Sequence, residues 1–395
     1  MKRILMISQT VFPPDIRLEK EIKSLYQNGF VVNVLCNQYD KTKTPNYKYC
    51  SISRFNAIFD SNRLNKIINF PIFFNPRLLY KSVKEYLRFK PDFIHAHDLP
   101  MVPIALVLKM LSRVPVIFDM HENYPEALKC FKKKGIINYI FKNPTLSKKL
   151  EQVCLKFVNH VFVVVEESKE RLVSEGYSAE KVSVVSNTVD LETFITDKKD
   201  ETIEKGSKDR FTLVYTGTVS PERGLETPVE AMKFLKNELP EIKLLVIGDG
   251  KSVSKLKDII KKYNLEEFVD LVSWPGHENL SKYISIADIC IIPQPCNEFI
   301  DTTIPHKLFE YMFMSKPVLT SDAKSLKRIV EETGAGKSFI SNNPRSFADN
   351  VIKMKKNFNQ CGIKGNKAVK EKYNWKREEK VMLDVYNNFC LKFKD

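Results

Sequence analysis

Short apolar runs alternate along the chain with segments of helical periodicity, and this alternation continues over most of the sequence. Apolar runs of this length predict buried strands of parallel sheets. The segments between them predict covering helices: in residues 17–27, for example, Leu18, Ile22 and Leu25 recur on one face. The predicted strands of the first half are RILMIS, VVNVLC, FIHAH, VPVIFDM, HVFVVV and KVSVVS, and those of the second half are FTLVYTG, IKLLVIGDG, VDLVSWPG, ADICIIP, KPVLTSD and KSFIS.

A polar, charge-rich stretch separates the two series of strands. Residues 195–209 contain almost no apolar side chains, which is typical of a linker. The sequence therefore predicts two Rossmann-like, doubly wound α/β domains, 1–194 and 210–373, that face a cleft between them. Residues 374–395 predict a separate C-terminal helix that packs back toward the first domain. Ligands of such sheets bind at the carboxyl ends of the strands.

The composition restricts the class of protein and of partner. A chain of 395 residues with 43% hydrophobic and 28% charged residues predicts a soluble globular protein. The net charge of +15 favours an anionic partner: nucleic acid, an anionic membrane surface or phosphorylated small molecules. Nucleic acid is the weakest candidate, because zinc-finger, RNP-like and helix-turn-helix signatures are missing from the sequence. Eight scattered cysteines, without a CxxC pair, predict reduced thiols and a cytoplasmic protein.

Three segments resemble cofactor or metal motifs without completing them. ETGAGKS (332–338) lacks the first glycine of a phosphate-binding loop and instead predicts a helix C-cap at Gly334 or Gly336. The GDG of residues 248–250 follows a strand but is not a full dinucleotide fingerprint. HAHD (95–98) could bind a metal, yet the end of a strand at a cleft edge explains it more simply. We therefore expect neither a metal nor a dinucleotide cofactor.

Two segments place charged side chains beside strand ends. FDMHENYPE (118–126) follows a buried strand, so His121 could donate to a sugar hydroxyl or transfer a proton near neutral pH; considered alone, a structural histidine is the simpler interpretation. YTGTVSPERGLE (215–226) predicts a strand, a glycine turn and a helix start. Arg223 at that turn is well placed to reach a phosphate, although an ordinary exposed arginine fits as well.

The segment TTIPHKLFEYMFMSKPV (302–318) predicts a helix with an unusual start. Thr302 or Thr303 could cap it, and Pro305 suits a first-turn position. The free N–H groups there, with Lys307 beside them, would suit phosphate, and Glu310 follows Lys307 on the same side of the helix. Taken alone, this segment is better explained as an amphipathic helix with a surface Lys–Glu pair.

In their order along the chain, these motifs resemble the glycosyltransferases of family 4, a large retaining group with the GT-B fold. The resemblance covers nearly the whole sequence and includes the IPHKLFEY segment, which matches a bacterial P-x-K-L-x-E-Y subgroup. It implies that Arg223 and Lys307 neutralise a nucleotide diphosphate, that Glu310 binds the ribose diol and that His121 lies near the donor sugar. It further implies acceptor-side residues and donor-binding residues, namely Asp15 and Arg17 for the acceptor, and Gly217, Thr218, Gly248, Thr302, Thr303, Ile304 and His306 for the donor.

The sequence departs from this family at three places. Thr302 stands where the frequent E-x7-E pair would have its first glutamate, Gly217 is followed by Thr218 instead of arginine, and QTVFPP replaces the glycine-rich first loop. These departures concern recognition of the donor sugar, with a hydroxyl at Thr302 in place of a carboxylate. They leave the residues of the diphosphate site intact.

The resemblance implies metal-independent transfer, with retention, of a sugar from a UDP- or GDP-linked donor to a glycan or lipid-linked acceptor in bacterial cell-surface polysaccharide synthesis. The alternatives are a sugar-nucleotide epimerase of the same fold and a non-catalytic protein that binds nucleotide sugars. Residues 129–149 carry seven lysines and no acid, interleaved with apolar residues. That pattern fits a segment at an anionic membrane surface, and a solvated lysine-rich face equally well, so peripheral attachment to the inner face of the cell membrane is one expectation.

Overall fold

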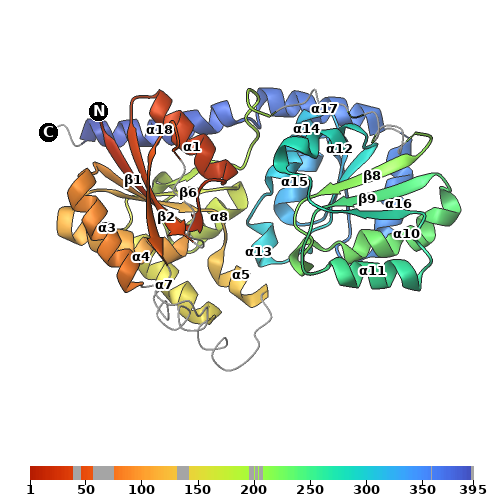
Figure 1. Ribbon diagram of the computed structural model, residues 1–395, viewed down its shortest axis with the longest axis horizontal. Helices are drawn as coiled ribbons and strands as arrows, with labels where there is room; N and C mark the ends of the chain where they lie inside the picture. The colour runs from red at the N-terminus through yellow and green to blue at the C-terminus, as the bar shows by residue number, and fades with distance from the viewer. Residues whose placement is uncertain are drawn as a thin grey trace. The chain divides into compact units, whose positions relative to one another are not determined.

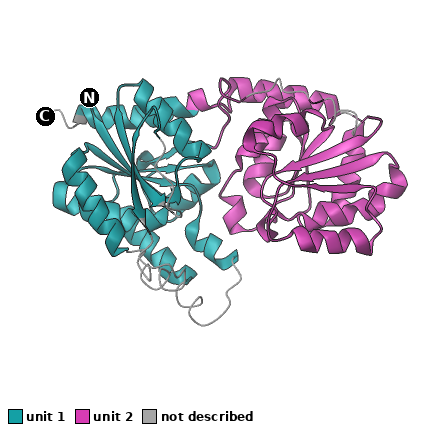
Figure 2. Ribbon diagram, viewed as in Figure 1, with its two compact units in different colours: residues 1–186, 378–395 teal, residues 187–377 magenta. Residues whose placement is uncertain are grey.

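The computed structural model describes residues 1–38, 46–56, 75–130, 142–194, 200, 203, 208–356 and 358–392. The chain forms two compact units: unit 1 comprises residues 1–186 and 378–395, and unit 2 comprises residues 187–377 (Figure 2). Each unit has a parallel sheet with helices on both faces (Figure 1), which confirms the predicted doubly wound α/β class. The predicted linker lies mostly outside the described residues, and the predicted domain boundaries stay predictions.

Unit 1 is built on a seven-stranded sheet with the order β3-β2-β1-β4-β5-β6-β7, in which all neighbours pair in parallel. The chain runs outward from β1 to β2 and β3 and then returns to β4, so the winding direction reverses between β1 and β4. In such sheets the functional residues gather at the carboxyl ends near this reversal. The strands are β1 (Arg3–Val11), β2 (Val31–Gln38), β3 (Ser51–Asn56), β4 (Phe93–His97), β5 (Val116–Met120), β6 (His160–Val163) and β7 (Val182–Val184).

Three helices of unit 1 begin at side-chain caps that the sequence provides. Asp15 accepts from the backbone N–H groups of Arg17 and Leu18, both at 3.1 Å, and so starts the first helix. Asn75 and Asn143 cap two others, each followed by a proline in the first turn. The helices are α1 (Ile16–Gln27), α3 (Pro76–Phe89), α4 (Val102–Ser112), α5 (Tyr124–Cys130), α7 (Pro144–Phe157), α8 (Glu166–Ser174) and, from residue 378 on, α18 (Trp375–Lys392), with 3-10 turns η1 (Leu99–Met101) and η2 (Ala179–Lys181).

Unit 2 has a six-stranded parallel sheet with the order β10-β9-β8-β11-β12-β13. Its strands are β8 (Phe211–Thr216), β9 (Ile242–Ile247), β10 (Val269–Val272), β11 (Ile289–Ile292), β12 (Val318–Ser321) and β13 (Gly336–Phe339). Its helices are α10 (Glu226–Glu238), α11 (Val253–Lys262), α12 (Leu280–Ser285), α13 (Glu298–Asp301), α14 (His306–Phe313), α15 (Lys324–Thr333), α16 (Pro344–Lys355) and α17 (Phe358–Glu371), with 3-10 turns η3 (Pro221–Arg223) and η4 (His277–Asn279).

All twelve predicted apolar runs form strands, and one further strand, β3, was not predicted. In the sequence of β3, SISRFN, four of six residues are polar, because the strand lies at the edge of its sheet, where most of its side chains are only partly buried. Gly334 ends α15 in the left-handed region, with φ of 64°, as the predicted C-cap requires. Among the helices that the structure describes, none combines the length and the apolar character needed to cross a membrane.

Candidate active site

Lys307 reaches from the first turn of α14 to the carboxyl end of β8 in unit 2. Its ammonium donates to the carbonyl of Thr216, the last residue of β8, and lies 3.8 Å from the centre of the Tyr215 ring. The hydroxyl of Tyr311, one turn further along α14, bonds the N–H and the hydroxyl of Thr216, both at 2.9 Å. These contacts hold the lysine at the strand end where ligands of such sheets bind.

Two glycines shape the backbone beside this lysine. Gly217 has φ of +121°, and a Cβ atom at this position would lie 2.7 Å from the Lys307 Nζ. Gly248, after β9, has φ of +147°, and a Cβ there would lie 1.9 Å from the carbonyl oxygen of Gly217. A side chain at Gly248 would clash with the backbone, whereas one at Gly217 would meet the flexible end of Lys307, and both φ values favour glycine.

A second cation lies close to Lys307. Arg223 ends the 3-10 turn η3, two residues after Pro221 begins it. Burial and then the charge of Arg223 lower the pKa of Lys307 well below its usual range, and the carboxylate of Glu310 opposes them only in part. A dianionic ligand bound here would offset both effects, because its negative charge favours the protonated form of Lys307 beside Arg223.

Glu310 lies one turn beyond Lys307 on α14 and is almost fully buried. One of its carboxylate oxygens lies 3.5 Å from Nε2 of His277, the first residue of η4, whose side chain is about half exposed. The predicted Lys–Glu pair at the surface is therefore wrong for Glu310, because its carboxylate turns into the unit. A buried carboxylate beside an exposed imidazole can accept hydrogen bonds from a diol.

The remaining predicted donor residues lie on the loop before α14 or beside β8. The predicted N-cap is wrong: the N-cap position of α14 is Pro305, and Thr302 instead ends α13, with its hydroxyl donating to the carbonyl of Glu298 at 2.7 Å. The carbonyl of Ile304 accepts from the Asn187 side chain at 2.9 Å. The carbonyl of Thr303 accepts a hydrogen bond from the Ser325 hydroxyl, and His306 is the first residue of α14. Thr218 is exposed, two residues after the end of β8.

In unit 1, His121 follows β5 and is held between two carboxylates. Its Nε2 lies 2.7 Å from Oδ2 of Asp119, and its Nδ1 lies 3.7 Å from Oδ2 of Asp98. Burial would lower the pKa of His121, but Asp119 and then Asp98 outweigh it and raise that pKa from 6.5 to about 10. At neutral pH the ring is therefore an imidazolium that donates hydrogen bonds, and the predicted proton transfer near neutral pH does not fit it.

Asp119 is the centre of this arrangement. Arg17 binds it with two parallel hydrogen bonds of 2.9 Å and 2.7 Å, and His97 Nδ1 lies 3.3 Å from it. Burial would raise the pKa of Asp119, yet Arg17 and then His121 hold that pKa well below its usual range. The ionised carboxylate in turn fixes the orientation of the His121 ring.

The two residues predicted to face the acceptor lie in different surroundings. Asp15 caps α1 at its N-terminus, where its side chain is within reach of Thr10 at 3.4 Å. Arg17 is buried, and its guanidinium binds Asp119, Glu21 and the carbonyl of Val185. We therefore assign Arg17 to the support of His121 through Asp119, and not to contact with an acceptor.

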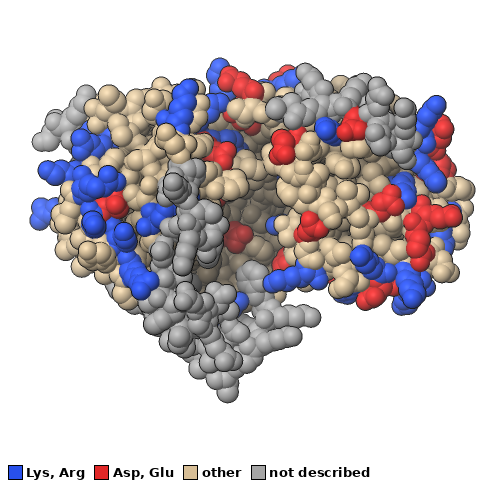
Figure 3. All heavy atoms as spheres, viewed as in Figure 1, with Lys and Arg blue, Asp and Glu red and all other residues tan. Residues whose placement is uncertain are grey.

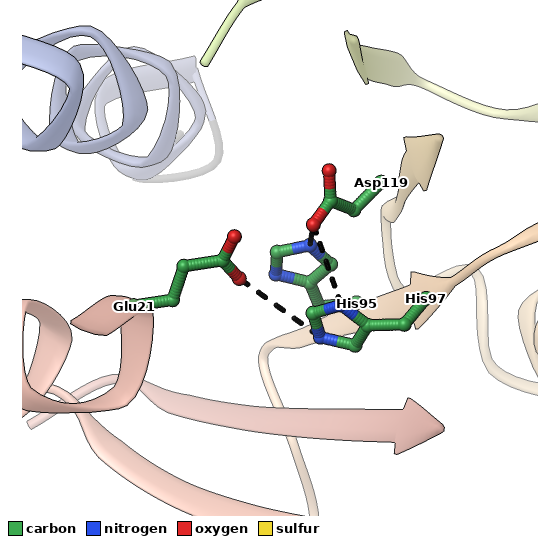
Figure 4. Close-up of side chains that lie close together, drawn as sticks. All are labelled: Glu21, His95, His97 and Asp119. Carbon is green, nitrogen blue, oxygen red and sulfur yellow. Dashed lines mark ion pairs between the residues drawn. The ribbon is translucent and has the colours of Figure 1, made fainter. Parts of the chain in front are cut away.

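Glu21, His95, His97 and Asp119 lie together in the interior (Figure 4), with one potential metal-ligating atom of each within 4.8 Å of the others. Both carboxylates already face the guanidinium of Arg17, at 3.0 Å and 2.7 Å. Nδ1 of His95 bonds the hydroxyl of Tyr386 at 2.7 Å, and burial lowers the pKa of both histidines, which keeps them neutral. We interpret the cluster as an ion-pair network in which Arg17 supplies the cation.

The sequence did not predict the residues that hold Lys307 and Glu310 in unit 2 or those that hold His121 and Arg17 in unit 1. In unit 2 these are Tyr215, Thr216, Tyr311 and His277. In unit 1 they are Asp98, Asp119 and Glu21, together with His97. One signal was present: Asp119 and His121 are two residues apart at the end of a strand, a spacing that places both side chains on one side.

Two protein-family models match this chain, one over most of the first series of strands and one over the second. Residues 19–193 match the Glycosyltransferase Family 4 model, and residues 197–372 match the model described as glycosyl transferases group 1. Together with the two parallel-sheet units, these matches support a glycosyltransferase of the GT-B type.

Individual relatives are distant. An uncharacterized glycosyltransferase of Methanocaldococcus jannaschii, MJ1059, is 23% identical over 62% of this chain and 59% of its own length. The amylovoran biosynthesis glycosyltransferase AmsK of Erwinia amylovora is 25% identical over 42% of this chain and 40% of its own length. The chain thus matches about half the length of these curated relatives.

Solved structures share the fold over nearly the whole chain. Sucrose-phosphate synthase of Thermosynechococcus elongatus superposes with a TM-score of 0.82 at 16% identity, covering 99% of this chain and 100% of that chain. HepE of Anabaena, solved with UDP-glucose, superposes with a TM-score of 0.73 at 15% identity, covering 98% of this chain and 100% of that chain. At these identities the likeness shows the fold.

Proposed function

We propose that the protein transfers a sugar, with retention of configuration, from a nucleotide-diphosphate sugar to a glycan or lipid-linked acceptor. Lys307 carries the proposal, because its pKa is lowered by burial and by the charge of Arg223 at the carboxyl end of β8. An anion bound beside both residues would favour the charged lysine again. The diphosphate of a sugar nucleotide supplies two adjacent negative groups.

The same two cations have a role in the reaction. As the bond to the sugar breaks, negative charge develops on the leaving diphosphate, and fixed positive groups stabilise it without a metal. In comparable anion sites, loss of one such group lowers the rate by about 10²–10³. We assign this role to Lys307 and Arg223, assign Glu310 to the ribose hydroxyls, and assign His121, as an imidazolium, to a hydroxyl of the donor sugar.

Relatives favour one donor and one biological setting. HepE was solved with UDP and glucose and with UDP-glucose, so we propose a UDP-linked donor first and a GDP-linked donor second. AmsK and WcaL of Escherichia coli are described as glycosyltransferases of amylovoran and, for WcaL putatively, of colanic acid biosynthesis. We therefore propose a bacterial surface polysaccharide as the product and the cytoplasm as the site of the reaction.

A thermal-shift screen against UDP, GDP, ADP and their common sugar conjugates tests the donor site. A ligand that binds only the folded protein adds about 2.7 kcal/mol of stability at about 100 times its Kd. We expect one nucleotide class to raise the Tm of the wild type. The shift should disappear in Lys307→Ala and Glu310→Ala and remain in the exposed controls Lys251→Ala and Glu331→Ala.

The outcomes separate the competing functions. If no nucleotide raises the Tm of the folded wild type, the transferase proposal is wrong. If a sugar nucleotide binds and is converted to its epimer without an acceptor, the protein is an epimerase. Binding without turnover, in the presence of a range of glycan acceptors, would indicate the non-catalytic alternative.

A further inference from the structure

Three neighbouring helices of unit 1 expose apolar side chains to solvent. Helices α3, α4 and α7 cover one face of the sheet, with α4 lying beside both of the others (Figure 1). The C-terminal ends of α4 and α7 are tied together, because Lys109 donates to the carbonyl of Phe157 at 2.6 Å. The exposed apolar residues are Tyr80, Leu87, Met110, Leu111, Val153 and Phe157, and the exposure reaches 84% at Met110 and 70% at Leu111.

The exposed charges on these helices all have one sign. None of the exposed residues in α3, α4 and α7, which the structure describes in full, is acidic. The two glutamates of these helices, Glu85 and Glu151, are buried and paired with Arg88 and with Lys148 and Arg171. Figure 3 shows lysine and arginine side chains gathered over this part of unit 1. The exposed basic residues on or next to these helices include Lys84, Lys90, Arg113, Lys149 and Lys156.

We call this surface the α3–α4–α7 face and define it by the eleven residues named in the two lists above. Its position follows from the topology. In a parallel sheet, each helix ends where the next strand begins, so Leu87, Met110, Leu111 and Phe157 lie at the amino edge of the strands. His121 follows β5 at the opposite, carboxyl edge. A partner on the α3–α4–α7 face would leave the candidate site in unit 1 uncovered.

Helix-end chemistry explains only part of this pattern. Basic residues at the C-terminus of a helix interact favourably with the helix dipole, which accounts for the C-cap residues Lys90 and Arg113 and for Lys156 in the last turn of α7. It gives no reason for large apolar side chains at the same three helix ends. Single exposed apolar residues are common on soluble proteins, but several on adjacent elements mark an interaction surface.

The charges select among the occupants of such a surface. A second copy of this face would bring basic groups against basic groups, which disfavours a symmetric dimer. Nucleic acid would satisfy the charges but leave Met110 and Leu111 without an apolar partner. An anionic bilayer satisfies both, because its headgroups attract lysine and arginine while apolar side chains enter the acyl boundary.

We propose that the α3–α4–α7 face is a docking surface for an anionic lipid bilayer. The segment predicted to meet a membrane, 129–149, is described only in part, since residues 131–141 lie outside the described residues. Its last residues, Lys148 and Lys149, belong to α7 and thus to the same helix as Phe157. The proposal does not depend on the donor chemistry of unit 2.

Sedimentation with vesicles tests the proposal on the full chain. We expect binding to vesicles that contain phosphatidylglycerol, little binding to pure phosphatidylcholine vesicles, and weaker binding as salt is raised. The charge variant Lys90→Asn/Arg113→Asn/Lys156→Gln should lower the partition coefficient about a hundredfold. The apolar variant Met110→Ser/Leu111→Ser/Phe157→Ser should lower it by at least as much.

Matched variants in unit 2 control for overall charge and hydrophobicity. Lys251→Gln/Lys257→Gln/Lys261→Gln removes the same charge, and Ile340→Ser/Ile363→Ser removes exposed apolar side chains; both should bind vesicles as the wild type does. Equal loss in the control and test variants would overturn the proposal, as would failure of the folded wild type to bind anionic vesicles. A change of oligomeric state in the apolar variant alone would assign the face to a second copy instead.

Discussion

Of the two carboxylates beside His121, Asp119 has the larger effect on its pKa. Because Asp119 lies 2.7 Å from Nε2 of His121 and holds its pKa at about 10, we expect Asp119→Asn to lower that pKa by several units, as followed by NMR titration of the ring. Asp98→Asn should lower it less, since Asp98 lies 3.7 Å away. Equal effects of the two substitutions would contradict the assigned geometry.

The same pair makes stability depend on pH. The pKa of His121 is higher in the folded protein than in the unfolded chain, so its stabilisation is complete below about 6.5 and is lost as the pH rises through about 10. Asp119→Asn should therefore flatten the fall of the unfolding free energy over this alkaline range. It should also cost about 3–5 kcal/mol near neutral pH, because Arg17 loses the carboxylate that accepts two of its buried hydrogen bonds. Denaturant unfolding at several pH values measures both effects.

We expect Lys307 to take up a proton when the nucleotide binds. Its pKa lies well below the usual range in the free protein, and a diphosphate beside it would raise that pKa. Binding should then take up protons. The affinity for the nucleotide should weaken as the pH rises from the pKa of Lys307 in the free protein to its pKa in the complex. Calorimetry of UDP binding in buffers of different ionisation enthalpy measures the uptake, which should vanish in Lys307→Arg, because a guanidinium stays charged throughout this pH range. A buffer-independent binding enthalpy in the wild type would rule out this coupling.

The turn after β8 can be tested at the scale of one structural element. Gly217→Ala places a methyl group where the Lys307 ammonium lies, and the flexible lysine can move away. We therefore expect donor binding to fall more than stability. Gly176→Ala is the matched control: its φ is also positive, at +89°, but nothing lies within 4 Å of the new Cβ atom. It should cost about 1 kcal/mol of stability and leave donor binding unchanged.

Elements differ in how far their sequence predicts them. Apolar runs predict the central strands because both faces of these parallel sheets are covered, whereas the edge strand β3 keeps polar residues and escapes notice. The predicted N-cap of α14 was wrong because the Thr302 hydroxyl donates to a carbonyl of the preceding helix, α13. The sequence offers two threonines as caps and does not show which helix the hydroxyl of Thr302 bonds. The motif that holds Lys307 and Glu310 was visible in the sequence; the network around Asp119 was not, since Arg17 lies 102 residues away.

At the scale of the whole molecule, the C-terminal helix completes unit 1. Tyr386 of α18 is fully buried, with its ring 5.5 Å from that of Phe30 and 5.3 Å from that of Phe93. Tyr386→Ala should destabilise unit 1 by about 3–5 kcal/mol, and Tyr386→Phe by about 1 kcal/mol through the bond to His95. The exposed Leu391→Ala on the same helix should have little effect.

Differential scanning calorimetry with and without nucleotide separates the two units. Nucleotide should raise the Tm of the unit 2 transition only, because the ligand binds unit 2. Tyr386→Ala should lower the Tm of the other transition, because the substitution lies in unit 1. A single transition that moves equally in both experiments would show that the units unfold together.

Because unit 1 is built from two separate segments of the chain, the two units cannot finish folding in the order in which they begin to be synthesised. Unit 2 is one continuous segment, 187–377, whereas unit 1 receives residues 378–395 last. At about 5–20 residues per second, the strands of unit 1 wait roughly 10–40 s for Tyr386 after residue 186 has been made. We expect the unit encoded second to finish folding first, and the aromatic surface of Phe30 and Phe93 to be where chaperones hold the nascent chain meanwhile.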